Sequence, residues 1–113
     1  MPRDEAYLLD MLIAARKILL FTQGVTREQF DQDELLQNTV IRMLEIIGEA
    51  ARNVSDGIKA IHSEIPWRQI VGMRHRLVHE YFRIDLERVW DTVEKDIPDL
   101  IRRIEPLVPS KNA

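Results

Sequence analysis

The sequence predicts an all-α fold: an antiparallel helical bundle of four main helices joined by short helical connectors. Apolar residues recur at three- and four-residue steps along most of the 113-residue chain, and capping residues precede the apolar stretches. The four glycines and five prolines are too few for the many turns of an all-β protein. We expect one domain over residues 1–113, with its core at about 4–105 and a frayed C-terminal tail at 108–113.

The first long helix is predicted over residues 4–23. Asp4 is a candidate cap at its start, and Gly24 stands where a C-terminal cap glycine belongs. Thr26 and Gln29 have the spacing of a capping box, in which a hydroxyl and an amide side chain satisfy backbone groups reciprocally. A short helical turn should therefore follow Gly24.

A second long helix is predicted over about 34–54, with Asp33 as its N-cap. Gly48 lies in its middle, where glycine costs about 1 kcal/mol relative to alanine. Such a glycine predicts close approach of another helix, and a dimer interface is one place where that could occur. A further short helix is expected at 57–62.

The C-terminal half is predicted to hold two more helices. The first covers about 66–82, because proline suits the first turn of a helix and Pro66 stands there. Asp85 is the expected N-cap of the second, which Pro98 should kink or split. The two tryptophans, Trp67 and Trp90, are expected to anchor the core.

The composition limits the possible functions. The chain has no cysteine, which excludes a disulfide scaffold, a thiolate metal site and a cysteine nucleophile, and which fits a reducing cytosol. No apolar run approaches the roughly 20 residues of a membrane helix, and the N-terminus lacks the apolar region of a signal peptide. We therefore expect a cytoplasmic protein with no membrane partner.

Positive charge is concentrated in one segment of an acidic chain. The formal net charge is −3, from 16 Lys and Arg against 19 Asp and Glu. Residues 67–88 hold five Arg and three acidic residues, a net of +2, so the remaining 11 basic and 16 acidic residues carry −5. Arginine binds phosphate oxygens in pairs better than lysine does. The segment is either a phosphate-binding patch or a solvated helix face.

Two of the three histidines lie four residues apart in the stretch MRHRLVHEYF, residues 73–82. The spacing of His75 and His79 resembles that of a zinc site on a helix, but Arg76 stands where such a site carries its glutamate. A guanidinium there repels a metal ion, and a third ligand is not evident, since His62 is the only other histidine. We predict no metal site and no cofactor.

An acid–base site is the other interpretation of this stretch. A histidine can move a proton near neutral pH and an arginine can hold a phosphate, so Arg74 and His79 could cleave RNA without a metal. Five residues apart on an ideal helix, they point about 140° away from each other. A symmetric dimer could bring copies of both to one cleft. The alternative is structural, with His79 packing or capping and Arg74 paired with a glutamate.

The segment from Arg74 to Tyr81 resembles the R-x4-H-x-Y motif of HEPN-domain ribonuclease toxins of the HepT type. The similarity extends over about residues 4–105, and five further stretches carry it: Phe21-Thr22-Gln23-Gly24, Ile46-Ile47-Gly48-Glu49-Ala50, Ile65-Pro66-Trp67, Gly72-Met73-Arg74 and Val89-Trp90. Many relatives have Asn or Asp after the motif arginine, where this chain has His75. That departure leaves the role of His75 open.

The resemblance implies a dimeric all-α bundle and a metal-independent endoribonuclease, with Arg74 and His79 as catalytic residues at a cleft between two copies. It implies a toxin of a toxin–antitoxin system of type II or VII, acting on RNA. Its antitoxin would be an MNT-type nucleotidyltransferase that transfers AMP from ATP to Tyr81. The alternative is a non-catalytic HEPN module that binds nucleotide, RNA or a partner.

Other charged residues have simpler interpretations beside the functional ones. His75, Arg68, Arg76 and Arg83 are candidates for contacting RNA, and the arginines could equally pair with nearby acids, namely Glu80, Asp85 and Glu87. Glu45 and Glu49 share one helix face. Because no histidine accompanies them, we expect that face to be solvated or to lie at an interface.

Overall fold

The computed structural model describes residues 2–109, except for the side chains of Pro2 and Tyr81. Its helical elements, in chain order, are α1 (Pro2–Thr22), α2 (Arg27–Asp31), α3 (Glu34–Asn53), α4 (Asp56–Ile61), α5 (Trp67–Glu80), the 3₁₀ turn η1 (Tyr81–Arg83), α6 (Leu86–Asp91), the π-helical turn η2 (Thr92–Asp96), α7 (Ile97–Ile104) and the 3₁₀ turn η3 (Glu105–Leu107). No strand occurs within residues 2–109, which confirms the all-α prediction.

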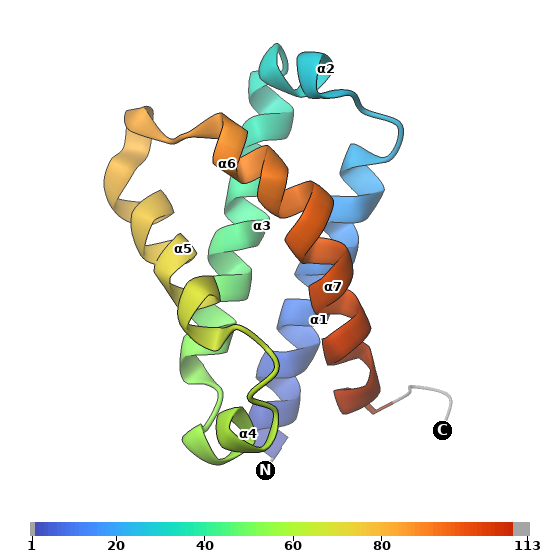
Figure 1. The fold of residues 1–113 in the computed structure, drawn as a ribbon, viewed down its shortest axis with the longest axis vertical. Coiled ribbons are helices and arrows are strands. Elements are labelled where there is room, and N and C mark those ends of the chain that lie inside the picture. The colour runs from blue at the N-terminus through green and yellow to red at the C-terminus, as the bar shows by residue number, and fades with distance from the viewer. Residues whose placement is uncertain (1, 110–113) are drawn as a thin grey trace.

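The long helices run up and down in turn around α3. Helix α3 packs against α1 on one side and against α5 on the other, and α7 packs against α1. Figure 1 shows α6, η2 and α7 following one another diagonally across the α1–α3 pair, while α5 stands at the edge of the bundle. The short helices α2 and α4 lie at opposite ends (Figure 1). This arrangement is the predicted bundle of four main helices with helical connectors.

One hydrophobic core joins the long helices, and both tryptophans belong to it, as predicted. The Trp90 ring packs against Phe30, with 4.9 Å between ring centroids. Trp67 is buried at the start of α5, and its indole N–H donates a hydrogen bond of 3.0 Å to the His62 carbonyl. This satisfied donor fixes the beginning of the helix that carries the candidate site.

Several predicted helix boundaries are confirmed by their capping contacts. Gly24 has a positive φ of 74° after α1, and Thr26 and Gln29 form the complete capping box of α2. The Asp33 carboxylate accepts a hydrogen bond of 3.0 Å from the Leu36 backbone N–H at the start of α3. Local chemistry therefore defines the N-terminal half of the chain.

Asp4 does not cap the first helix. Helix α1 already begins at Pro2, so Asp4 lies inside its first turn. Its carboxylate instead accepts hydrogen bonds from the Ser55 backbone N–H at 2.9 Å and the Ser55 hydroxyl at 2.7 Å. These bonds lower the pKa of Asp4. Asp4 thus ties the start of α1 to the loop before α4, a long-range contact that the local pattern could not reveal.

The predicted effect of Pro98 is confirmed, and it takes the form of a π-helical turn. Proline lacks an N–H and its ring crowds the carbonyl four residues earlier, so a regular α-helix cannot pass through it unchanged. The Ile97 N–H bonds to the Thr92 carbonyl, five residues back, which widens the helix just before Pro98.

The remaining predictions differ from the structure only at helix ends. Helix α5 ends at Glu80 and continues as the tighter η1, whereas the pattern predicted helix to 82. Of the predicted frayed tail, residues 110–113 lie outside the described residues. Within the described part of the chain, no helix is both long and apolar enough to cross a membrane.

Candidate functional site

Helix α5 carries the motif residues, and it turns them toward three different surroundings. Buried Leu77 directs one side of the helix into the core. Arg74 lies on the side next to α3, His75 and His79 are exposed, and Arg76 is half-buried on the side next to α6. The charged residues of the motif are therefore divided among separate surfaces of one chain.

Arg74 is held against α3 by a network of charges. Its Nε lies 3.3 Å from the Glu49 Oε1. Arg52 donates two hydrogen bonds to the same carboxylate, at 3.2 and 3.1 Å, and Asn53 donates a third at 3.4 Å. The bonds from Arg52, with the nearby charges of Arg52 and Arg74, lower the pKa of Glu49. Glu49 is therefore an ionised partner for Arg74 at neutral pH.

Gly48 allows this approach of the two helices. A Cβ atom at Gly48 would stand 2.2 Å from the Arg74 Cβ and 3.2 Å from the Ile70 carbonyl oxygen. The prediction of a close helix contact at Gly48 is confirmed, but the contact lies between α3 and α5 of one chain and not between two copies. At this distance between the helices, only a residue without a side chain fits at position 48 of α3, opposite Arg74.

A shallow cavity of about 270 Å³ opens beside Arg74. Its lining comes from α1, α3 and α5 and is rich in charged groups; it comprises Tyr7, Asp10, Arg42, Glu45, Ile46, Glu49, Ala50, Asn53, Arg74 and Val78. Glu45 pairs with Arg42 at 3.4 Å. The shared face of Glu45 and Glu49 is thus an ion-paired surface beside the motif arginine, and His79 does not line it.

The two exposed histidines of α5 stack on each other. The rings of His75 and His79 are 4.3 Å apart between centroids and inclined by 52°. Neither imidazole forms a hydrogen bond with any residue that the structure describes. His75, whose role the sequence leaves open, therefore restricts where the His79 ring can lie.

The structure does not bring Arg74 and His79 together within one chain. Arg74 lines the shallow cavity formed with α1 and α3, and His79 is exposed in the last turn of α5. The structural alternative is partly met, because Arg74 does pair with a glutamate. Tyr81 begins η1 immediately after α5, and its side chain lies outside the described part of the structure. Phe82, its neighbour, is fully exposed.

The candidate RNA-contacting arginines are spread along α5 and η1. Arg68 and Arg83 are exposed. Arg76 is half-buried, and one of its terminal nitrogens lies 4.0 Å from the Met73 sulfur. Among the described side chains, none of the three pairs with an acid within 4.0 Å, so the alternative of pairing with Glu80, Asp85 or Glu87 is not met.

In the described part of the chain, no three or more His, Asp or Glu side chains gather in a group that could hold a metal ion. His75 and His79 are therefore left as a two-residue pair.

Sequence reasoning missed the link between Glu49 and Arg74. It assigned Glu49 to a solvated or interface face. The side chain is 44% exposed, but its carboxylate also lies between two guanidinium groups, which the sequence did not predict. Gly48 could have indicated this link. A mid-helix glycine predicts a close contact with another helix, and Glu49, the next residue, must then also lie near that helix.

Comparison with known proteins gives a family match over most of the chain. The family model described as "Ribonuclease HepT-like" matches residues 11–107. A protein of Thermococcus cleftensis named "Probable ribonuclease HepT" is 45% identical over 101 residues, which cover 89% of this chain and 92% of that protein. A candidate RNase of Caldanaerobacter subterraneus subsp. tengcongensis is 34% identical over 108 residues, covering 96% of each. A candidate RNase of Methanocaldococcus jannaschii is 35% identical over 101 residues, covering 89% of this chain and 93% of that protein.

No solved structure is significantly similar to the chain. The family match nevertheless spans α3 and α5, which hold the ion pair of the motif arginine, and α1 from residue 11 onward. The chain therefore belongs to the HepT-like ribonuclease family.

Proposed function

We propose that this protein is a metal-independent endoribonuclease that acts as a homodimer, with each site combining Arg74 of one copy with His79 of the other. One observation carries the proposal: Arg74 is fixed in the cavity beside α3, while His79 is exposed in the last turn of the same helix. A second copy packed on the exposed side of α5 could supply the missing partner. Membership of a ribonuclease family supports RNA as the substrate.

The chemistry needs only the two side chains. His79 accepts the proton of a ribose 2′-hydroxyl, and the 2′-oxygen attacks the adjacent phosphorus. The bond from phosphorus to the 5′-oxygen breaks, and the protonated His79 gives that oxygen a proton. The products are a 2′,3′-cyclic phosphate and a 5′-hydroxyl. Arg74 stabilises the negative charge that grows on the phosphate oxygens.

The geometry of Arg74 suits this role. Glu49 approaches its Nε from the α3 side, and the guanidinium donates no hydrogen bond to any described residue. An arginine has five N–H donors, so the terminal ones can receive a phosphate while Glu49 keeps the group oriented. Arg74 is also about one-third exposed, which leaves it open to a ligand from solvent.

The proposal extends to how the ribonuclease activity is regulated, and it places the protein in the cytoplasm. The protein would be the toxin of a toxin–antitoxin pair, and an MNT-type nucleotidyltransferase would neutralise it at Tyr81. The phenol oxygen would attack the α-phosphorus of ATP, pyrophosphate would leave, and the phenol proton would pass to solvent. Tyr81 follows His79 by two residues at the end of α5, so an added AMP would bring a bulky anion close to the site.

Mixed dimers test the composite site. Arg74→Ala and His79→Ala proteins are each expected to be inactive in chelator. After unfolding and refolding together in equal amounts, mixed dimers should each contain one intact site, which restores roughly a quarter of the wild-type activity. A cleft that lies within one chain predicts no recovery. His62→Ala removes the third imidazole of the chain and keeps the backbone N–H by which residue 62 caps α4; it is the matched control and should retain activity.

The non-catalytic binding module is the second candidate, and the Arg74–Glu49 ion pair favours it because that pair can serve structure alone. This alternative predicts that the wild-type protein binds RNA or its partner without cleaving RNA in any mixture.

The Tyr81 proposal has an independent test. The wild-type protein and Tyr81→Phe are incubated with the nucleotidyltransferase and ATP, and intact mass is recorded. One or more AMP groups on wild type and none on the variant is the expected result; an unmodified wild-type protein removes the claim.

A further inference from the structure

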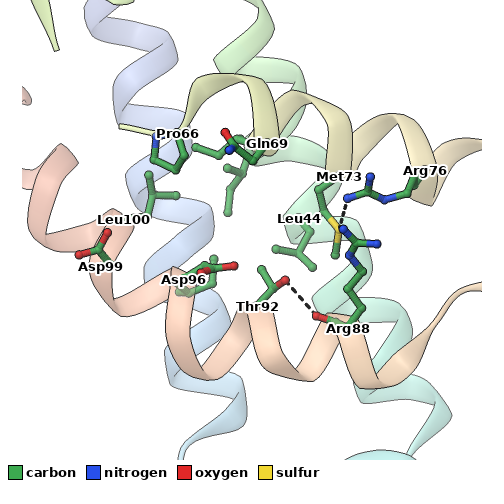
Figure 2. Close-up of a pocket in the computed structure, with 13 residues that line it drawn as sticks. Leu44, Pro66, Gln69, Met73, Arg76, Arg88, Thr92, Asp96, Asp99 and Leu100 are labelled. Atoms are coloured by element: carbon green, nitrogen blue, oxygen red, sulfur yellow. Dashed lines mark hydrogen bonds between the residues drawn. The ribbon is translucent and has the colours of Figure 1, made fainter. Parts of the chain in front are cut away.

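A second cavity, of about 370 Å³, lies between α5 and the helix formed by α6, η2 and α7 (Figure 2). Its size is within the range of small-ligand sites. Apolar side chains form most of its lining, namely Leu44, Ile47, Pro66, Ile70, Met73, Ile97 and Leu100. It opens on a different side of α5 from the cavity beside Arg74, since the two share no lining residue.

Two arginines stand at one end of this cavity. Figure 2 shows Arg76 from α5 and Arg88 from α6 reaching toward the sulfur of Met73. Both also line the adjoining hollow of about 200 Å³, which Glu80 and Asp85 border. Neither arginine comes within 4.0 Å of a carboxylate oxygen among the described side chains. Two guanidinium groups therefore border the same space without a paired anion.

This charge arrangement favours an anionic ligand. Like charges around one cavity repel each other, and an anion between them stabilises both. A guanidinium group can donate two parallel hydrogen bonds to two oxygens of one phosphate. The other end of the cavity carries Asp96, and Asp99 there is already bonded to Arg103 at 2.9 Å. The cavity thus has one cationic end, one acidic end and an apolar middle, which suits one phosphate attached to a flat apolar group.

The π-helical turn η2 shapes the side of the cavity opposite α5. Thr92 and Asp96, its first and last residues, both line the space. The Thr92 hydroxyl donates a hydrogen bond of 3.0 Å to the Arg88 carbonyl, which ties η2 to α6 (Figure 2). A π-helical turn is an uncommon element that often occurs at functional sites. Here the turn places two of its residues in the wall of the cavity.

We propose that Arg76 and Arg88 form a phosphate subsite for RNA and that the apolar cavity beside them takes the neighbouring nucleoside; this rests on the proposed action on RNA. The subsite would bind a nucleotide away from the cleaved bond. It would therefore set affinity and the length of RNA required, while Arg74 and His79 carry out the reaction.

Binding and cleavage are measured separately to test this subsite. The probe is a fluorescent single-stranded RNA oligonucleotide with 2′-O-methyl riboses, which cannot be cleaved through the 2′-oxygen. Fluorescence anisotropy is followed across a series of salt concentrations. The Arg76→Gln/Arg88→Gln protein should bind roughly tenfold to a hundredfold more weakly than wild type, the size expected when charged hydrogen bonds are removed. The slope of log affinity against log salt should fall by about 0.7 for each phosphate that the variant no longer binds.

Lys95→Gln is the matched control. It removes a positive charge from η2, but Lys95 is exposed and does not line the cavity. Its affinity and salt slope should equal those of wild type. An Arg76→Lys/Arg88→Lys protein keeps both charges and should hold the salt slope while losing affinity, because lysine lacks the planar pair of donors. This variant also separates a binding defect from misfolding.

Four results would overturn the subsite. The Arg76→Gln/Arg88→Gln protein could bind as wild type does, Lys95→Gln could weaken binding equally, or wild type could fail to bind the probe. Polyglutamate is the competitor that represents an acidic protein partner. If it displaces the probe as efficiently as unlabelled RNA does, that result also contradicts an RNA subsite. Failure of the nuclease proposal looks different: wild type would bind the probe through these arginines yet leave ordinary RNA uncut.

Discussion

The Arg74 side and the His79 side of α5 differ in how much one chain does to position them. On the Arg74 side, a close backbone approach at Gly48 and an ion pair with Glu49 restrict the side chain. On the His79 side, the imidazole stacks on the ring of His75 and forms no hydrogen bond with a described residue. An acid–base group must be held within hydrogen-bond reach of its proton. Under the proposed roles, one chain would prepare the phosphate-binding half of the site and leave the proton-transfer half to be positioned by something else.

The largest expected effect separates the two stacked histidines. His79→Ala should lower the rate of RNA cleavage by about 10²–10⁴, the usual contribution of general acid–base catalysis. His75→Ala removes only a ring that contacts His79 and should cost less than about tenfold in rate. Single-turnover cleavage with chelator present measures both. Equal losses for the two variants would mean that the pair acts as one unit and that His79 has no special role.

The next effect tests how tightly the Arg74 side is built. Gly48→Ala places a Cβ 2.2 Å from the Arg74 Cβ, an atom next to the backbone that cannot move without α5. Overpacking of this kind costs about 1–3 kcal/mol in the free energy of unfolding, less the helix propensity that alanine regains. Urea unfolding at a fixed protein concentration measures the change.

Gly72→Ala is the control for that measurement. Apart from its chain neighbours and the adjacent helix backbone, no atom lies within 4 Å of a Cβ at Gly72, so alanine should stabilise α5 by up to about 1 kcal/mol. A Gly48→Ala protein as stable as Gly72→Ala would show that the two helices separate at little cost, and the contrast between the sides of α5 would lose its basis.

Glu49 should affect cleavage through Arg74. Glu49→Gln keeps the shape of the side chain and removes the charge that Arg74 faces at 3.3 Å. We expect about a tenfold loss of cleavage rate, equivalent to about 1.4 kcal/mol in the barrier. A double-mutant cycle distinguishes positioning from general damage: in an Arg74→Ala background, Glu49→Gln should have almost no further effect. Additive losses would contradict a positioning role.

Sequence patterns predicted local features better than contacts between helices. The helix ends at Gly24, Thr26 and Asp33 follow from bonds between residues within four positions of each other, so short patterns report them. The divergence of Arg74 and His79 follows from helix geometry alone. The Glu49–Arg74 pair does not, because it depends on how α3 lies against α5.

The same limit explains two other findings. Arg88 received no role from the sequence, since its proximity to Arg76 exists only after α6 packs beside α5. Pro98 predicted an interrupted helix, but whether a proline produces a kink, a break or a π-helical turn depends on which carbonyl the surrounding packing leaves free. Asp4 was assigned to a local cap because its partner, Ser55, is distant in the sequence.

The smallest expected effect concerns α1, which contributes Tyr7 and Asp10 to the cavity beside Arg74. Hydrogen bonds from Ser55 lower the folded-state pKa of Asp4, so its carboxylate form stabilises the fold. That stabilisation is complete above the unfolded-state pKa of about 3.9. It disappears as the pH falls through the lower folded-state pKa. Asp4→Asn should therefore be less stable than wild type at neutral pH, and the difference should shrink below about pH 4.

Urea unfolding across pH 2–7 gives this difference. Asp10→Asn removes a carboxylate of the same helix that accepts no hydrogen bond from the described residues, so it should show no such convergence. If Asp4→Asn and wild type stay equally far apart at every pH, the Asp4 contact stabilises the fold through shape and not through charge.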